Sequence, residues 1–571
     1  MRPLPYLGLI GLVITLTLAA CSPAPSAGTS PPGERQTAPP GVKRITTAIR
    51  SSPISLIDMK KQRGGTVRGI DGVEELAHAG LAYIRGDGTR GAQIAEVLPT
   101  VDNGLWKVFP DGRMETTWTI KRTAKWHDGA PLTVDDFLFA GVIERDRELE
   151  LTPYQEYDLI ESIATPDPYT MIVTWRRPYI DADGMFSYRA AGLPLPKHLL
   201  EQAYQEDKAN FTALPYWTEE FVGLGAFSVR EWVRDSHIVL RAFDDYVFGR
   251  PKIDEIEVKF IPDNNTLLAN IIAGTDLTLG KTLSLDIALG AAEQWKGGRI
   301  AVLPQNWTPI NVQFIDPDPP IVADLRFRKA LLLALDRQQL ADFVFSGHGS
   351  VAHSYVDRTT PMYGIVEPFV VRYDYDPRGA AQILESLGYS KRGDGFLYDP
   401  AGRRLNIDLR IPLQNDIHAK TAAPVADYWH QLGVAVEQVG IPIQRATDRE
   451  YRALYPAFEI VERRNSLQVS EMIRMHGSEV QLAEQRFRGS GTMRYRNAEH
   501  DTLIERYATT IPMPDRMEAL GRLVHHQTEN LTHLPIFFGA DPTLISNRLI
   551  NVTARGDAFT QAWNVHEWDV Q

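Results

Sequence analysis

A single cysteine, Cys21, occurs in this chain of 571 residues. One thiol cannot form an intramolecular disulfide, so the fold has to be stabilised by its hydrophobic core. Cys21 follows an apolar run, residues 7–18, that begins after Arg2 and ends before Ala19-Ala20. A basic start, a short apolar stretch and small residues are typical of an export signal, because a membrane span needs about 20 apolar residues.

The residues Leu18-Ala19-Ala20-Cys21 resemble a lipobox, in which the signal is cut before a cysteine whose thiol carries lipid. The alternative is an ordinary buried cysteine, which its position after the signal disfavours. Residues 22–41 contain six prolines, three glycines and three serines, and no aromatic or large aliphatic side chain. We therefore predict a lipoprotein signal peptide at 1–20, lipid attachment at Cys21 and a flexible tether over 21–41.

Residues 42–571 have a globular composition, and 43% of the whole chain is hydrophobic. This stretch is too long for one hydrophobic core and predicts two or three domains. The formal net charge of −12 disfavours nucleic acid as a partner, because phosphate binding calls for a basic surface.

Strand and helix signals alternate along this stretch, which predicts an α/β or α+β fold. Polar and apolar residues alternate at 117–120 and 255–260, as in half-buried strands. Thr133 with Asp136 three residues later predicts a helix start, and so does Asp376 followed by Pro377. Asp336 is expected to cap a further helix.

Four motifs follow in order along the chain: AKWHDGAPLTVDDF at 124–137, LPKHLL at 195–200, DDYVFGRPKIDEI at 244–256 and LRFRKAL at 325–331. Together they resemble family 5 of the extracellular solute-binding proteins, the oligopeptide-, dipeptide- and nickel-binding receptors of ABC importers. The segment 223–227 is similar to a fifth motif but departs from its usual residues at three positions. The resemblance extends from about Ile45 to about Asn551.

The resemblance implies an α/β, two-lobed fold like that of periplasmic binding proteins of type II, in the large peptide-binding subclass with an extra domain and a hinge between the lobes. It places lobe I at 42–82, 215–305 and 535–571, the extra domain at 83–214, packed on lobe I, and lobe II at 306–534. It also implies a monomeric receptor, anchored by its lipid outside the cytoplasm on the periplasmic or cell-surface side of the bacterial membrane. Such a receptor delivers its ligand to an ABC permease and ATPase complex.

In peptide-binding members of this family, an acidic residue of the second lobe pairs with the α-ammonium group of the ligand. The corresponding stretch here, 458–467, contains neither the Trp, the Asp nor the Pro of the family pattern. Glu462 is one candidate for the ammonium partner. Arg463 and Arg464 instead favour an anionic group, which a guanidinium binds through two hydrogen bonds. The third interpretation is that all three are exposed loop charges.

Position along the family pattern adds five ligand-binding candidates, for each of which packing or surface exposure is the alternative. They are Arg63 and Gly65 in a first-lobe loop, Tyr154 and Tyr157 near an aromatic wall, and Trp307 at a crossover between the lobes.

The sequence offers no catalytic constellation, and we expect no enzyme, metal or cofactor. Residues 274–282 look like a phosphate-binding loop, but five residues separate the glycines where four are needed. His525, His526 and His533 fall in a predicted helix and the loop after it and lack the spacing of metal ligands, so solvent-exposed positions are expected there and no metal site. Cys21 is used for lipid, and no G-x-S-x-G nucleophile elbow occurs.

The predicted function is capture of a peptide between two lobes for import. One alternative is a receptor for a non-peptide solute, such as a nickel chelate or a sugar. Another is a surface lipoprotein that uses the same fold for sensing or adhesion without a permease.

Overall fold

A computed structural model describes residues 41–57, 69–149, 151, 155–188, 190–280, 282–413, 416–555 and 560–571. The chain divides into two compact units, Met1–Gly41 and Val42–Gln571, and every element described below belongs to the second. The predicted signal peptide, Cys21 and nearly all of the tether lie outside the described residues. Among the helices that the structure describes, none is long and apolar enough to cross a membrane.

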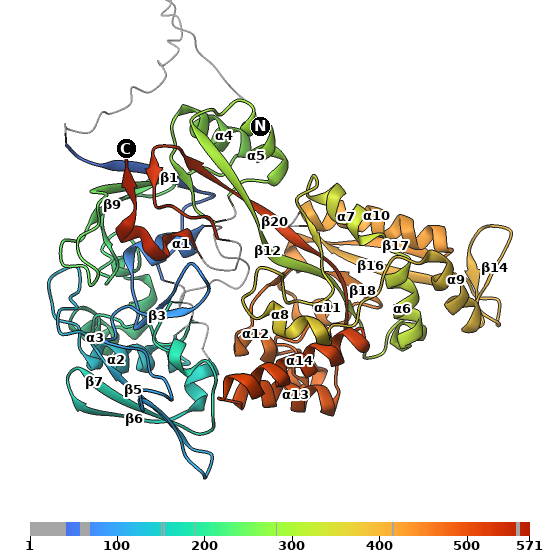
Figure 1. The fold of residues 1–571 in the computed structure, drawn as a ribbon, viewed down its shortest axis with the longest axis horizontal. Helices are drawn as coiled ribbons and strands as arrows, with labels where there is room; N and C mark the ends of the chain where they lie inside the picture. Colours follow the sequence, from blue (N-terminus) through green and yellow to red (C-terminus); the bar gives the residue numbers. More distant parts are fainter. Residues whose placement is uncertain are drawn as a thin grey trace, which may run out of the picture. The chain divides into compact units, whose positions relative to one another are not determined.

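A mixed sheet of 12 strands runs through the described part of the second unit (Figure 1). Its order is β17-β16-β18-β12-β20-β11-β1-β10-β9-β8, with β13 beside β20 and β19 beside β12. The strands are β1 (Arg44–Ile49), β8 (Phe227–Val233), β9 (His237–Ala242), β10 (Glu255–Phe260), β11 (Leu277–Thr278), β12 (Gly298–Val312), β13 (Ser350–Val351), β16 (Asn406–Pro412), β17 (Ala435–Ile441), β18 (Phe458–Ile460), β19 (Arg463–Arg464) and β20 (His533–Ser546). The strand predicted at 255–260 is confirmed as β10.

Two long antiparallel strands, β12 and β20, connect the two lobes of the fold (Figure 1). We call the side of the sheet with β1 and β8–β11 the first lobe, and the side with β16–β18 the second lobe. The register of the β12–β20 pair shifts between Pro304 and Trp307 and again between Thr308 and Pro309. Pro309 faces Pro535 across the pair. Since proline has no N–H group, the ladder lacks donors at these positions.

A separate four-stranded antiparallel sheet has the order β4-β5-β7-β6. We call this sheet, with helices α2 and α3 and the loop that follows β7, the extra domain. These elements are β4 (Trp106–Val108), β5 (Met114–Thr119), β6 (Ile160–Asp167), β7 (Thr170–Trp175), α2 (Val134–Arg145) and α3 (Lys197–Glu206). The helix start predicted at Thr133 is confirmed, and the Asp136 carboxylate accepts the Thr133 N–H at 3.0 Å. Trp118, Trp126 and Trp175 are fully buried in the core of this domain.

Helices accompany the large sheet in both lobes, and some of them pack on the sheet while others pack on one another (Figure 1). In the first lobe they are α1 (Ile70–Ala77), α4 (Asn264–Ala273) and α5 (Leu285–Ala292). In the second lobe they are α6 (Leu325–Leu333), α7 (Arg337–Val344), α8 (Tyr363–Val366), α9 (Pro377–Ser386), α10 (Asp416–Leu432), α11 (Arg449–Ala453), α12 (Val469–Ile473), α13 (Ala498–Thr509) and α14 (Met513–Glu529). The caps predicted at Asp336 and Asp376 are confirmed, because their carboxylates accept the amides of Gln339 and Gly379.

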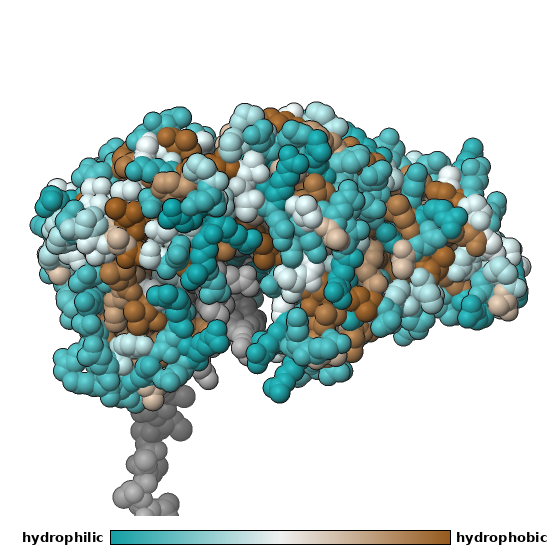
Figure 2. Space-filling view, turned by 90° about the horizontal axis from the view of Figure 1, so that it is seen from below, coloured by the Kyte–Doolittle hydropathy of each residue, from teal (hydrophilic) through white to brown (hydrophobic). Residues whose placement is uncertain are grey.

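Three short two-stranded sheets complete the described fold. They are β2 (Ala82–Ile84) with β3 (Arg90–Ala92), β14 (Ser390–Lys391) with β15 (Leu397–Tyr398), and β21 (Leu549–Ile550) with β22 (Asp569–Val570). Hydrophilic residues predominate on the face shown in Figure 2, where apolar residues form separate patches. The large apolar side chains gather in three large clusters, of which one continues from the extra domain into the second lobe and another from the first lobe into the extra domain.

Candidate functional site

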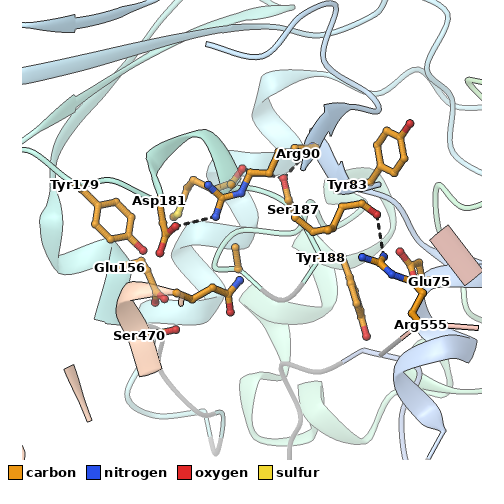
Figure 3. Close-up of a pocket in the computed structure, with 16 residues that line it drawn as sticks. Glu75, Tyr83, Arg90, Glu156, Tyr179, Asp181, Ser187, Tyr188, Ser470 and Arg555 are labelled. Atoms are coloured by element: carbon orange, nitrogen blue, oxygen red, sulfur yellow. Dashed lines mark hydrogen bonds and ion pairs between the residues drawn. The ribbon is translucent and has the colours of Figure 1, made fainter. Parts of the chain in front are cut away.

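A cleft opens where the first lobe and the extra domain face the second lobe (Figure 3). In this structure the space in the cleft that is free for a small molecule is only about 30 Å³, the share of about one water molecule, so a larger ligand enters only when the lobes move apart. The residues that line it from the first lobe and the extra domain include Glu75, Tyr83, Arg90, Glu156, Tyr179, Asp181, Tyr188 and Arg555. Gln468 and Ser470 line it from the second lobe. Because its walls come from both lobes, the cleft has its full lining only when the lobes are together.

Arg90, on β3, binds two carboxylates, of which that of Asp181 lies in the wall of the cleft (Figure 3). Its Nη2 lies 2.8 Å from Asp181 Oδ1, and its Nη1 pairs with Asp183. Burial alone would lower the pKa of Arg90, but Asp183 and Asp181 outweigh that effect and raise it. The guanidinium passes directly over Gly184, where a Cβ would come within 2.8 Å of Arg90 Nε. The loop that carries both aspartates therefore wraps closely around one arginine.

An acidic and aromatic surface lies beside this arginine, formed by Glu156 and Tyr179 (Figure 3). Burial raises the pKa of Glu156; the charge of Asp181 adds to this shift and that of Arg474 opposes it. Burial also raises the pKa of Tyr179, again helped by Asp181. Within the described residues, Glu156 forms no ion pair with a cation. The surface can accept hydrogen bonds from N–H groups of a ligand and offers an aromatic ring for apolar contact.

On the opposite side of the cleft, the polar groups are already bonded to the protein. Arg555 donates to the carbonyls of Ile84 and Arg85 at 3.1 and 2.9 Å. Glu75 accepts a hydrogen bond from the Thr560 hydroxyl. Tyr188 donates its hydroxyl to the Asp71 carbonyl at 3.0 Å. These contacts hold the cleft wall in place and leave its aromatic rings to contact a ligand.

Several residues predicted from sequence cannot be placed in the cleft. Arg63, Gly65 and Tyr154 lie outside the described residues, as does Cys21. Tyr157 is only 4% exposed and packs in the core of the extra domain, where its ring lies against Gly141 of α2.

Trp307 lies on the crossing strand β12, which agrees with its predicted place at a crossover. Its ring is 4% exposed and packs against Tyr355 and His533, with centroids 6.1 and 5.4 Å apart. Trp307 therefore supports the joint between the lobes from inside the core.

The stretch 458–467, predicted to anchor the ligand, pairs with β12 and does not line the cleft. Arg463 and Arg464 form β19, which pairs with Trp307 and Asn306 of β12. Glu462 accepts a hydrogen bond from the Asn306 amide at 2.5 Å. Arg463 points into the second lobe, where it donates to Asn311 Oδ1 and Thr492 Oγ1 at 3.2 Å each, and burial lowers its pKa.

The chain enters the cleft only after this stretch, at Gln468 and Ser470. The sequence reasoning missed both of them, together with Arg90, Glu156, Tyr179 and Asp181. No local pattern marks these residues, because the cleft joins segments that are far apart in the chain.

Two of the three histidines that the sequence predicts to be exposed, in a helix and the loop after it, are buried in the structure. His526 and His533 are each only 6% exposed, whereas His525 is on the surface. His533 starts β20, so it is buried by strand pairing and not by a helix, and its ring packs on Trp307. Among the described residues, no group of three or more His, Cys, Asp or Glu side chains could hold a metal ion.

Comparison with known proteins decides the family. Residues 96–459 match the sequence model of the bacterial extracellular solute-binding proteins, family 5, middle region. The chain belongs to this family. Membership places the protein outside the cytoplasm and assigns it to a class of binding proteins, not enzymes.

Relatives of this family 5 protein include the oligopeptide-binding protein AppA of Bacillus subtilis (strain 168). The two are 26% identical over 333 residues, which cover 57% of this chain and 58% of AppA. The match thus spans little more than half the length of that relative.

Two solved structures of similar fold show the architecture over nearly the whole chain. An oligopeptide-binding protein from Thermus thermophilus, complexed with a pentapeptide, has a TM-score of 0.71 and 21% identity, covering 92% of this chain and 96% of its own. NikZ from Campylobacter jejuni, in complex with Ni(L-His), has a TM-score of 0.72 and 18% identity, covering 92% and 99%. At these identities the likeness shows the fold, which is the predicted two-lobed α/β fold.

Proposed function

We propose that this protein captures a peptide in the cleft between its lobes and delivers it to an ABC importer. The observation that carries the proposal is the cleft itself, which is lined by Glu156 and Tyr179 from one side and by Gln468 and Ser470 from the other. Family membership and the peptide-binding relative AppA support it. A ligand that touches both sides binds the closed arrangement more tightly than the open one, so its binding free energy shifts the population toward closure.

The proposed ligand contacts follow from what the cleft offers. The α-ammonium group of a peptide would meet the carboxylate of Glu156. Side chains of the peptide would contact the rings of Tyr83, Tyr179 and Tyr188. Arg90 is already neutralised by two aspartates, so a ligand carboxylate finds little free positive charge there.

We further propose that lipid on Cys21 holds the monomeric protein at the membrane. The proline-rich tether over 21–41 would then let the folded unit reach the permease. The export signal and the location of the family outside the cytoplasm support this arrangement.

A non-peptide solute is the second candidate. The stretch 458–467 lacks the Trp, Asp and Pro of peptide-binding members, and its Arg463 is bonded inside the second lobe. The ammonium anchor of those members therefore has no direct counterpart in this stretch. NikZ, which shares the fold, holds a nickel–histidine chelate.

Native mass spectrometry of the purified protein, followed by thermal-shift assays, tests the proposal. A peptide at 100 times its Kd stabilises the protein by about 2.7 kcal/mol, which raises Tm by about 2 °C for a chain of this size. Stabilisation by a metal chelate or sugar, with no shift from any peptide in a panel of three to nine residues, would establish the second candidate instead.

A variant pair tests the contact with the ammonium group. Glu156→Gln should weaken binding of a peptide with a free N-terminus by about tenfold or more, and leave the N-acetylated peptide unaffected. Glu161→Gln, at an exposed position on β6, is the matched control and should bind both peptides like the unaltered protein. Equal losses for the free and acetylated peptides would show that Glu156 does not receive the ammonium group.

A further inference from the structure

We infer that Asp181 is a positioning residue that holds the second lobe against the extra domain and so fixes Gln468 and Ser470 over the cleft. The inference concerns the same cleft and thus rests on the proposed function. It is testable without a ligand, however, because it predicts a property of the protein alone.

The carboxylate of Asp181 has one oxygen bonded on each side of the cleft. Oδ1 accepts from Arg90 Nη2 on β3 at 2.8 Å. Oδ2 accepts from the backbone N–H of Val469, the first residue of α12 in the second lobe, at 2.7 Å. Hydrogen bonds to an ionised carboxylate are roughly twice as strong as neutral ones. Asp181 is therefore a direct link between the two bodies.

Rigid surroundings hold this carboxylate in place. Arg90 also pairs with Asp183, so the loop from Asp181 to Asp183 is fixed at both ends on one guanidinium. The side chains of Arg90 and Asp181 are only 20% and 17% exposed, which limits screening by salt.

The second lobe presents the Val469 amide in a similarly fixed way. The Tyr507 hydroxyl of α13 donates to the Leu467 carbonyl at 2.7 Å, two residues before Val469. Val469 is 5% exposed and belongs to the same hydrophobic core as Tyr179 and Ile180 of the extra domain. Beside it, the Ile180 N–H donates to the Ala508 carbonyl at 3.1 Å, a second backbone hydrogen bond across the contact.

The consequence for the cleft follows from the order of residues in the chain. Val469 lies between Gln468 and Ser470, and both of these line the cleft. Fixing the Val469 amide therefore fixes two polar side chains relative to Glu156 and Tyr179. Since both oxygens of Asp181 are bonded to the protein, it acts on the ligand through these neighbours and not as the ligand's own anchor.

Two variants break this link from opposite sides. Asp181→Asn replaces one acceptor oxygen with an NH₂ group and removes the charge. Val469→Pro removes the donor N–H. Proline is tolerated at the first position of a helix, and Gln468 already has the extended backbone (φ −62°, ψ 143°) that proline requires of the residue before it. Asp183→Asn is the matched control, because Asp183 binds the same Arg90 and, among the described residues, reaches the second lobe only through the charge of Arg516 on α14 and not through a hydrogen bond.

Hydrogen–deuterium exchange and small-angle X-ray scattering on the ligand-free protein measure the result. We expect Asp181→Asn and Val469→Pro to speed exchange of the Ile180 amide by about tenfold or more and to increase the radius of gyration. The double variant should show no further change, since both substitutions break one bond. Asp183→Asn should leave both quantities unchanged, and slow exchange in β5 of every variant shows that the extra domain remains folded.

Three results would overturn the inference. The first is unchanged exchange at Ile180 in both variants. The second is faster exchange at the Val469 amide alone in Asp181→Asn, with an unchanged radius of gyration. That result would show that the bond affects only its own amide and does not hold the second lobe against the extra domain. The third is an equal response to Asp183→Asn, which would assign the effect to the charge around Arg90. A protein that binds no peptide but shows the expected exchange pattern would contradict the proposed function and leave the role of Asp181 intact.

Discussion

Glu144, near the end of α2, carries a carboxyl group inside the extra domain and makes this domain sensitive to pH. The residue is 3% exposed, and both of its oxygens lie within 3.2 Å of the Gly192 amide that donates to them. Burial raises the pKa of Glu144 from 4.5 to about 8; the Gly192 hydrogen bond opposes the shift and the charge of Glu156 adds to it. At neutral pH the folded protein therefore keeps this group largely protonated.

The direction of the pH effect follows from proton counting. Between pH 4.5 and pH 8 the folded state holds the Glu144 proton and the unfolded state has lost it. The free energy of unfolding therefore falls as pH rises: the contribution of Glu144 is fully present below pH 4.5 and is lost as pH passes 8. One pKa unit corresponds to about 1.36 kcal/mol, and integration from pH 5 to pH 8 gives a loss of about 3.5 kcal/mol.

Glu144→Gln isolates this contribution, because glutamine has nearly the same shape, still accepts from Gly192 and cannot ionise. The free energy of unfolding of the variant, relative to the unaltered protein, should rise by about 3.5 kcal/mol between pH 5 and pH 8. Denaturant titrations followed by tryptophan fluorescence report on it, since Trp118, Trp126 and Trp175 are buried in the same domain. Glu161→Gln, at an exposed site, is the control. Parallel pH curves for Glu144→Gln and the unaltered protein would refute the reasoning.

Two further predictions concern the second and first lobes. Burial, together with the charges of His526 and His476, lowers the pKa of His500 from 6.5 to about 3, so the stability it supports is present above pH 6.5 and is lost as pH falls toward 3. In denaturant titrations, the free energy of unfolding of His500→Asn should fall by about 3 kcal/mol less than that of the unaltered protein between pH 6.5 and pH 4. An equal fall in the two proteins would contradict this. Gly225→Ala should destabilise the protein by about 2 kcal/mol, because a Cβ there would lie 2.4 Å from the Ala77 carbonyl carbon. Gly290→Ala is the control: it lies in the exposed part of α5, has no atom within 4 Å of the added Cβ, and should stabilise the protein by about 0.5–1 kcal/mol. Equal shifts of the unfolding midpoint in the two variants would contradict the close approach at Gly225.

Local structure was predictable wherever the deciding contact lies within a few residues. Thr133 with Asp136 and Asp376 with Pro377 mark helix starts because the cap and the capped amide are three residues apart. His533 was wrongly predicted to be exposed, because its burial depends on the pairing of β20 with β12, which the sequence around it does not encode. The cleft was beyond reach for the same reason: Arg90 and Asp181 are 91 positions apart, and Asp181 and Val469 are 288 apart.

The joint between the lobes is a pair of hydrogen-bonded strands, and this determines how the protein can move. A single-stranded linker can swivel in many directions, whereas the β12–β20 ribbon resists sliding and stretching and yields mainly by bending across its face. It is weakest where its ladder lacks donors, at Pro309 opposite Pro535, and where its register shifts after Pro304. Opening and closing should therefore be a rotation of one lobe about a single axis, set by the bending of the β12–β20 ribbon. The two faces of the contact at Asp181 then meet in the same alignment at every closure, without a search over orientations.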